Sequence, residues 1–202
     1  PGASMNLEEK VQIAEILDEL KVDIIEAGFP IASNGDFESV SEISKNIKKS
    51  TIAALARAKI ADIDRAWEAV KYAASPKIHT FIATSPLHMK YKLNKSPNDV
   101  LDAIKHTVKH ARKLCPNVEW SCEDAGRSEV EFLFKCIELA IDCGASTINI
   151  PDTVGYTLPN EFGSIFNAVK NNVPNIDKAI LSTHTHNDLG LAVANSIAAI
   201  QE

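Results

Sequence analysis

The chain alternates short runs of apolar residues with longer stretches in which apolar residues recur every three to four positions. The short runs predict six buried strands, at 22–26, 51–56, 78–83, 118–121, 147–150 and 179–182. The longer stretches predict amphipathic helices at 6–20, 37–49, 63–74, 98–114, 129–143, 159–171 and 189–200. Short strands separated by helices of about 12 to 17 residues are typical of a parallel sheet with helices outside it.

Two α/β architectures fit this alternation, an open doubly wound sheet and a (β/α)8 barrel. No strand is followed by the glycine-rich GxGxxG turn of dinucleotide-binding doubly wound sheets. Polar side chains instead collect at the C-terminal ends of the predicted strands: Glu26, Arg57, His79, Ser121, Glu123, Asp152, Thr153, His184 and His186. In a barrel such ends meet at one mouth, where catalytic residues come from several strands. The positions therefore favour an α/β TIM barrel in a single domain.

The stretch "AILSTHTHNDLGLAVANS" places two histidines one residue apart where a predicted strand ends. Residues i and i+2 of a strand point to the same face, so His184 and His186 are expected to lie side by side. Two adjacent imidazoles suit a shared metal ion. The alternative is a half-buried strand whose two polar residues are hydrogen-bonded by neighbours.

The other polar strand ends also have structural alternatives. Glu26 and Arg57 could form an ion pair, and His79 could be a hydrogen-bonded histidine of the core. Glu123 and Asp152 could cap the helices that follow them. The coincidence of polar residues at the same end of six strands argues against explaining each of them separately.

Composition narrows the class of protein. The 202 residues are 45% hydrophobic and 24% charged, with a formal net charge of −6, which is ordinary for a globular protein with a sizeable core. An acidic balance offers no electrostatic footprint for nucleic acid. No apolar stretch approaches the roughly 20 residues that span a bilayer, and no signal-peptide pattern is present. The four cysteines form no CxxC pair, so we expect reduced thiols in a cytoplasmic protein.

Several segments, in the same order along the chain, resemble a known family. They are "IIEAGFPIAS", "IHTFIATSPLHM", "WSCEDAGRSE", "INIPDTVGYTLPNE" and "STHTHNDLGLAVANS". They look like the alpha-isopropylmalate and homocitrate synthases, which are acyl-CoA Claisen condensing enzymes on an HMG-CoA lyase-like TIM barrel. The pairing of FIATSPLHM with SCEDAGRSE favours the 2-isopropylmalate branch. Homocitrate synthase, citramalate synthase and a catalytically inactive binding paralogue are the alternatives.

The resemblance implies a metal-dependent condensation of acetyl-CoA with 2-oxoisovalerate, giving 2-isopropylmalate and CoA in leucine biosynthesis. The divalent ion would be Mn, Zn or Mg, and its ligands would include His184 and His186. By the same resemblance Glu123 and His79 are the catalytic candidates, and His79, Ser121, Glu123 and Thr153 bind substrate. Asn187 and Asp188 are expected to shape the turn and cap the next helix.

The resemblance also implies that more chain surrounds these residues. Family members have a strand ending in an RDGEQ-type motif immediately before the segment that corresponds to Pro1-Gly2, and this motif supplies an arginine and a metal-binding aspartate. They also have a further strand after the HxHND helix. Residues 1–202 are therefore expected to be a partial catalytic TIM-barrel domain, holding about strands two to seven, of an enzyme that is a homodimer at full length.

Overall fold

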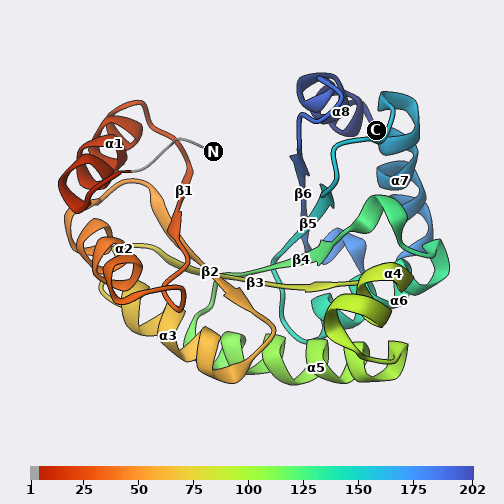
Figure 1. The fold of residues 1–202 in the computed structure, drawn as a ribbon, viewed down its shortest axis with the longest axis horizontal. Coiled ribbons are helices and arrows are strands. Elements are labelled where there is room, and N and C mark those ends of the chain that lie inside the picture. The colour runs from red at the N-terminus through yellow and green to blue at the C-terminus, as the bar shows by residue number, and fades with distance from the viewer. Residues whose placement is uncertain (1–4) are drawn as a thin grey trace. The chain divides into compact units, whose positions relative to one another are not determined.

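A computed structural model describes residues 5–202 of the chain (Figure 1). These residues belong to two compact units. The N-terminal unit holds the chain up to Thr80 together with His110–Val118, and the C-terminal unit holds Phe81–Lys109 together with Glu119–Glu202.

The strands are β1 (Ile24–Gly28), β2 (Thr51–Arg57), β3 (Pro76–Ala83), β4 (Val118–Glu123), β5 (Thr147–Asp152) and β6 (Ile180–Thr185). Their order in the sheet is the order of the sequence, and the pairs β1–β2, β4–β5 and β5–β6 are parallel. A doubly wound sheet reverses its strand order partway, whereas a barrel adds each new strand beside the last. The predicted α/β fold with six strands of an incomplete TIM barrel is therefore confirmed.

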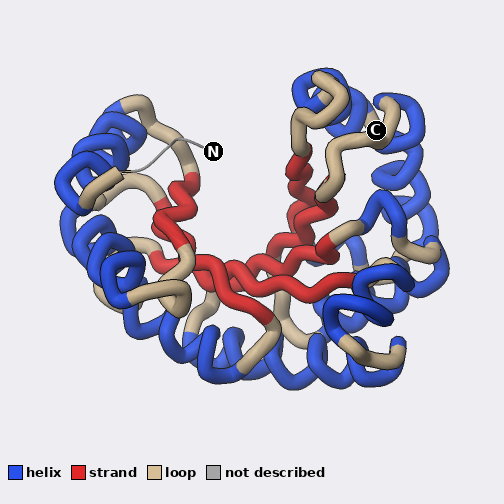
Figure 2. The backbone as a smooth tube through the Cα atoms, viewed as in Figure 1, coloured by secondary structure: helices blue, strands red, loops and turns tan. Residues whose placement is uncertain are grey.

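Each predicted helix is present, as Figure 2 shows by the alternation of strand and helix along the chain. They are α1 (Leu7–Glu19), α2 (Asn34–Asn46), α3 (Ile60–Val70), α5 (Pro97–Leu114), α6 (Val130–Asp142), α7 (Pro159–Asn172) and α8 (Ala192–Gln201). Helix α2 begins three residues before the predicted start because Ser33 caps it, accepting a hydrogen bond from the Asp36 N–H at 3.0 Å. None of the helices in the described part of the chain has the length and apolarity needed to cross a membrane.

The segment after β3 contains helical structure that the sequence pattern does not predict. Helix α4 (Pro86–His88) runs into a one-turn π-helix, η1 (Met89–Leu93), which ends at Asn94 in a left-handed conformation with φ of 52°. Single π-turns are rare and are frequent at functional sites. Two short 3-10 turns, η2 (Ala125–Arg127) and η3 (Ile176–Lys178), are likewise absent from the prediction.

The core of the N-terminal unit lies between strand β2 and the helices that follow the strands. Ile63, Ala66 and Val70, at helical spacing on α3, are fully buried, as are Ile52 and Ala54 on β2. Helix α3 contacts β2 and α2, and α2 contacts α1. Full burial of an isoleucine or valine contributes roughly 1.5–3 kcal/mol, so this apolar stripe fixes how α3 lies on its strand.

The core of the C-terminal unit is centred on β5, which is buried along its whole length. Leu133 and Ile137 of α6 are buried, and Phe162 and Phe166 of α7 pack edge to face with ring centroids 5.3 Å apart. Helices α7 and α8 contact each other (Figure 1). Strand β6 is less buried than β5, and the Ile180 side chain at its start is 70% exposed.

Candidate functional site

The two histidines lie side by side, as the strand spacing predicts. His184 is on β6 and His186 follows its last residue, held in register by a hydrogen bond from the His186 N–H to the Asp152 carbonyl at 3.3 Å. Both side chains are exposed, and their Nε2 atoms are 3.1 Å apart. In the turn that follows, the Asn187 side chain accepts a hydrogen bond from the first N–H of α8 at 3.2 Å, as expected. Asp188 lies beside Gly155, and among residues 5–202 no bond from it to α8 is observed.

The His186 ring is oriented by the end of the neighbouring strand. Its Nδ1 atom is hydrogen-bonded to the backbone carbonyl of Thr153. A carbonyl only accepts, so Nδ1 carries the proton and the lone pair of the neutral ring is on Nε2, facing His184. A backbone carbonyl that fixes the tautomer of a ligating histidine is the usual supporting contact in metal sites.

This donor pair fits a divalent ion. The two Nε2 atoms are 3.1 Å apart, close enough for both to bind one ion, since a nitrogen ligand lies about 2.0–2.1 Å from the metal it binds. Within residues 5–202 no third histidine, cysteine or carboxylate joins them in a group that could hold a metal. His184 and His186 therefore fit as two members of a ligand set, and their role as metal ligands stays a prediction.

Gly155 makes the close approach of two loops possible. Its φ is +62°, and a β-carbon there would lie 2.4 Å from Asp188 Oδ2 and 2.9 Å from the Asp188 backbone nitrogen. The Gly155 carbonyl accepts a hydrogen bond from the Leu189 N–H at 3.2 Å. The loop after β5 and the loop after His186 therefore pack backbone to backbone, which only glycine allows.

Asp152 is a structural anchor beneath this pair of loops. Its carboxylate is 1% exposed and accepts hydrogen bonds from the Thr157 hydroxyl at 2.8 Å, the Thr157 N–H and the Asn195 amide. The idea that Asp152 caps the next helix is wrong, because α7 begins after Leu158. Asp152 instead joins the loop after β5 to α8, since Asn195 belongs to that helix.

Glu123, at the end of β4, lies among charged groups from the segment after β3. Its Oε1 is in ion-pair contact with Lys92 Nζ, on the π-helix η1, and lies 3.9 Å from His88 Nδ1. The Glu123 side chain is 16% exposed, so it is reachable yet only partly hydrated. Glu123 does not cap a helix, because α6 begins after Glu129. Such a carboxylate can hold or pass a proton at its oxygen atoms.

Ser121 is two residues earlier on β4, on the same face as Glu123 by strand alternation. It is buried, and its hydroxyl accepts a hydrogen bond from the Asn149 amide at 2.8 Å. Asn149 is its register partner on β5. The predicted roles of Ser121 and Glu123 in substrate binding remain predictions.

His79 lies in the N-terminal unit, at the fourth of the eight residues of β3, so the expectation that it stands at the C-terminal end of its strand is wrong. Its side chain is 11% exposed. Its Nδ1 is in ion-pair contact with Glu26 on β1. The alternative pairing of Glu26 with Arg57 is wrong. Arg57 is instead bonded to Asp62 on α3 by its Nε at 2.5 Å and its Nη2 at 3.3 Å, and this bond raises the pKa of the guanidinium. The role of His79 toward substrate stays a prediction.

The four cysteines take no part in nucleophilic chemistry here. All are free and buried, and burial raises the pKa of each thiol, to about 12 for Cys136. A thiol with a raised pKa holds its proton at neutral pH and is inert. The prediction that the four cysteines form no disulfide is confirmed, and the structure shows in addition that all four are buried.

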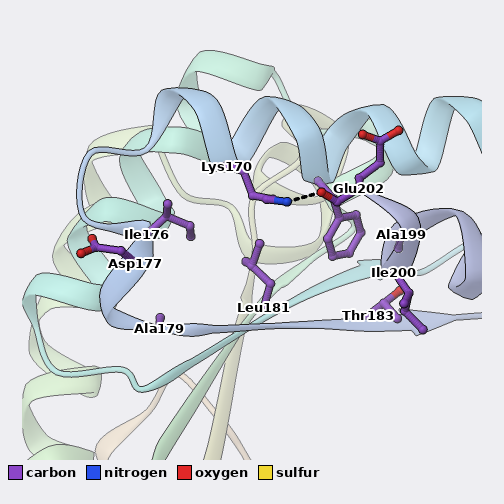
Figure 3. Close-up of a pocket in the computed structure, with 10 residues that line it drawn as sticks. Lys170, Ile176, Asp177, Ala179, Leu181, Thr183, Ala199, Ile200 and Glu202 are labelled. Carbon is purple, nitrogen blue, oxygen red and sulfur yellow. Dashed lines mark hydrogen bonds between the residues drawn. The ribbon is translucent and has the colours of Figure 1, made fainter.

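A cavity of about 490 Å³ lies on the other face of β6 (Figure 3). Leu181 and Thr183 line it from the strand, facing residues of η3, α7 and α8 such as Ile176, Phe166 and Ala199. Strand alternation places Leu181 and Thr183 on the face opposite His184. The Lys170 side chain donates to the Glu202 carbonyl across it. The cavity is therefore a packing space between strand and helices, separate from the histidine pair.

Sequence reasoning missed the residues that surround Glu123. His88, Lys92, Asp124 and Arg127 all fall inside or beside the segments FIATSPLHM and SCEDAGRSE, but no role follows from their spacing. Their proximity depends on the π-helix and on the left-handed backbone of Asp124, with φ of 65°. An aspartate before a glycine-containing turn was the one available local signal.

Comparison with known proteins matches this fold and these segments. A family model described as HMGL-like matches residues 1–202. Curated relatives named 2-isopropylmalate synthase are 62% identical in Caulobacter vibrioides, 60% in Hydrogenovibrio crunogenus and 58% in Ruminiclostridium cellulolyticum, each over 201 residues and the whole of this chain. The chain spans only 38–40% of the length of these relatives.

Solved structures show the same fold at low identity. An HMG-CoA lyase from Bacillus subtilis has a TM-score of 0.80 at 21% identity, covering 99% of this chain and 68% of that one. An HMG-CoA lyase from Acinetobacter baumannii, in complex with coenzyme A and 3-methylmalate, has a TM-score of 0.76 at 18% identity, covering 99% of this chain and 66% of that one. From the family match over its whole length, this chain belongs to the HMGL-like family.

Proposed function

We propose that residues 1–202 are the partial catalytic domain of a 2-isopropylmalate synthase. The reaction joins acetyl-CoA and 2-oxoisovalerate, with water, into 2-isopropylmalate and CoA, an acyltransferase step of leucine biosynthesis. The observation that carries the proposal is identity of 58–62% over the whole chain to curated enzymes of that name. Because the chain spans 38–40% of those relatives, the activity is assigned to the protein expressed from its complete gene.

The histidine pair supports a metal-dependent reaction. His184 and His186 would hold a divalent ion through Nε2, with the His186 ring kept in place by the Thr153 carbonyl. When bound, such an ion acts as a Lewis acid toward the ketone of a 2-oxo acid. Nitrogen ligands with oxygen and water suit Zn or Mn and, less typically, Mg.

The remaining residues of the C-terminal unit would act on the substrates directly. The Thr153 hydroxyl would donate a hydrogen bond to the carboxylate of the oxo acid. Glu123, in contact with Lys92, would orient or relay the proton that the methyl group of acetyl-CoA must lose. Ser121 would line the acyl pocket. We propose His79 as an oxo-acid-binding residue on the family resemblance alone.

Two further proposals, on CoA binding and on the assembly of the complete enzyme, are based on related proteins. An HMG-CoA lyase of the same fold has been solved in complex with coenzyme A, which supports a CoA thioester as a substrate here. We also propose that the complete enzyme is a cytoplasmic homodimer.

The test is CoA release by the protein expressed from its complete gene, followed with a thiol reagent. We expect turnover to be fastest with 2-oxoisovalerate and slower with pyruvate or 2-oxoglutarate. A clear preference for pyruvate would assign the protein to the citramalate synthases, and a preference for 2-oxoglutarate to the homocitrate synthases. No CoA release with any of the three would reject the proposal.

A further inference from the structure

The turn after β4 contains an aspartate in an unusual state. Asp124 has a left-handed backbone, with φ of 65° and ψ of 36°, and its side chain is 1% exposed. Aspartate tolerates this conformation better than most residues, but a buried charge at such a position needs partners to be stable there. The groups that contact Asp124 therefore indicate what this turn stabilises.

The Asp124 carboxylate is fully engaged. Arg127 donates from Nε to Oδ1 at 2.8 Å and lies 2.8 Å from Oδ2 through Nη2, which is a two-point pairing within the same turn. The Ser85 hydroxyl, from the segment after β3, donates to Oδ2 at 2.5 Å. The carboxylate raises the pKa of Arg127, so the guanidinium stays charged. Paired, planar bonds of this kind fix orientation as well as charge.

The Asp124 backbone reaches the next strand. Its N–H donates to the Thr153 hydroxyl at 2.9 Å. A threonine hydroxyl has one proton to give and two lone pairs, and here a lone pair is already used. Within the described residues, 5–202, no acceptor takes the hydroxyl proton of Thr153. The hydroxyl is therefore prepared to donate, which suits an anionic acceptor such as a carboxylate.

The turn at Asp124 also restrains the backbone of Glu123, the residue before it. The Glu123 carbonyl accepts a hydrogen bond from the Thr84 N–H at 3.1 Å, and the left-handed residue follows immediately. The backbone of Glu123 is thus held between β3 and the Asp124 turn. One buried aspartate links the ends of β3, β4 and β5 at the place where two proposed substrate-binding residues stand.

We propose that Asp124 is a positioning residue for substrate binding. Its carboxylate, clamped by Arg127 and Ser85, holds the backbone N–H against Thr153 and so presents the Thr153 proton to the carboxylate of the 2-oxo acid. This rests on the proposed function, which it deepens. The oxo acid is recognised through its carboxylate, and acetyl-CoA binding does not depend on this bond.

The test uses the protein expressed from its complete gene and compares Asp124→Asn with Thr153→Val. Asparagine tolerates the left-handed backbone but puts an amide where Arg127 and Ser85 need acceptors, so the turn loosens. We expect both variants to raise the KM for the oxo acid about tenfold or more and to leave the KM for acetyl-CoA within about twofold. Glu129→Gln is the matched control, because Glu129 is exposed and its side chain caps nothing.

A double variant separates positioning from mere stability. If Asp124 acts through Thr153, then Asp124→Asn added to Thr153→Val should raise the KM for the oxo acid little further. Thr153→Ser, which keeps the hydroxyl, should restore most of the affinity. A lowered Tm with unchanged KM for the oxo acid, or multiplicative KM effects in the double variant, would overturn the inference.

Calorimetric binding of 2-oxoisovalerate alone makes the outcome independent of turnover. If the wild type binds the oxo acid, and if both single variants and the double variant weaken that binding by the same factor, the inference holds. This is so even where no CoA is released, in which case only the proposed reaction fails. If CoA is released normally but Asp124→Asn binds the oxo acid as tightly as the wild type, the reaction stands and the inference fails. Absence of oxo-acid binding by the wild type would overturn the inference.

Discussion

In the N-terminal unit His79 pairs with Glu26, whereas in the C-terminal unit His184 faces His186. Both histidine sites stand on or just after strands of the same parallel sheet. The first pair joins residues 53 positions apart, and the second joins residues two positions apart. The first pair joins a carboxylate to a histidine whose ring is mostly buried. The second pair consists of two exposed imidazoles whose Nε2 atoms face each other.

The difference lies in what each pair can do. A carboxylate beside His79 fixes the orientation of the ring, which suits contact with a polar substrate. Two imidazoles that face each other form at most one hydrogen bond between their Nε2 atoms, so they gain little stability as a pair. Their spacing does allow both to bind one ion. We therefore expect changes at the C-terminal pair to have larger effects than changes at the N-terminal pair.

The largest effect is expected from removing either imidazole of the C-terminal pair. His184→Ala or His186→Ala should lower affinity for the divalent ion by more than about 100-fold, because even residues that only support a ligand cost 10–100-fold. Turnover should fall with it. The measurements are metal content of the purified protein and CoA release with and without a chelator.

His106→Ala is the control for that change, since His106 is exposed on α5. It should leave metal content and turnover unchanged. Full activity of the His184 or His186 variant, or of a preparation stripped of metal, would refute the assignment of these histidines as ligands.

A smaller effect is expected from disturbing the loop contact beneath the pair. Gly155→Ala puts a β-carbon 2.4 Å from Asp188 Oδ2 and 2.9 Å from its backbone nitrogen, at a φ of +62°. The free energy of unfolding should fall by about 2–3 kcal/mol, and metal affinity should fall as the His186 loop shifts. Denaturant unfolding and metal titration measure the two effects.

Gly190→Ala is the matched control, because its φ is +74° but nothing lies within 4 Å of the added carbon. It should cost only the left-handed strain, about 1 kcal/mol, and leave metal affinity unchanged. Equal losses in the two variants would show that the close approach of the loops is not what Gly155 provides.

The smallest effect is expected at the N-terminal pair. Glu26→Gln removes the charge opposite His79 but keeps an acceptor, and the Glu26 side chain is 44% exposed. The free energy of unfolding should change by less than about 1 kcal/mol, while the KM for the oxo acid should rise because the His79 ring is less firmly held. Glu38→Gln, on the exposed face of α2, should change neither. If Glu26→Gln lowered turnover more than His184→Ala does, the ranking of the two pairs would be reversed.

The local part of this architecture could be predicted from the sequence. Alternating apolar runs located all six strands, and the HxH spacing placed His184 beside His186, because strand geometry repeats every two residues. The hydrogen bond from Asn187 to the start of α8 agrees with the role in the turn that was expected for this residue. The role of these residues as ligands does not follow from spacing alone and remains a prediction.

Long-range partners could not be predicted in the same way. Arg57 was the expected ion-pair partner of Glu26, but Arg57 bonds Asp62, which is only five residues away in the first turn of α3. Glu26 instead contacts His79, a pairing that the sequence did not predict. The π-helix η1 brings Lys92 to Glu123, and its apolar spacing is not that of an α-helix. The distance between two residues in the sequence does not predict which of several oppositely charged side chains will form an ion pair.

By itself, the sequence determined which segments are strands and helices, that the strands are parallel, and that two imidazoles share one face of a strand end. These depend on residue periodicity and short-range sterics, which a few neighbouring residues fix. Only the tertiary structure decided that Asp124 takes a left-handed backbone and gives its N–H to Thr153, 29 residues away. That bond needs the ends of β3, β4 and β5 together, because the buried carboxylate at Asp124 is stable only once Ser85 and Arg127 are both in place.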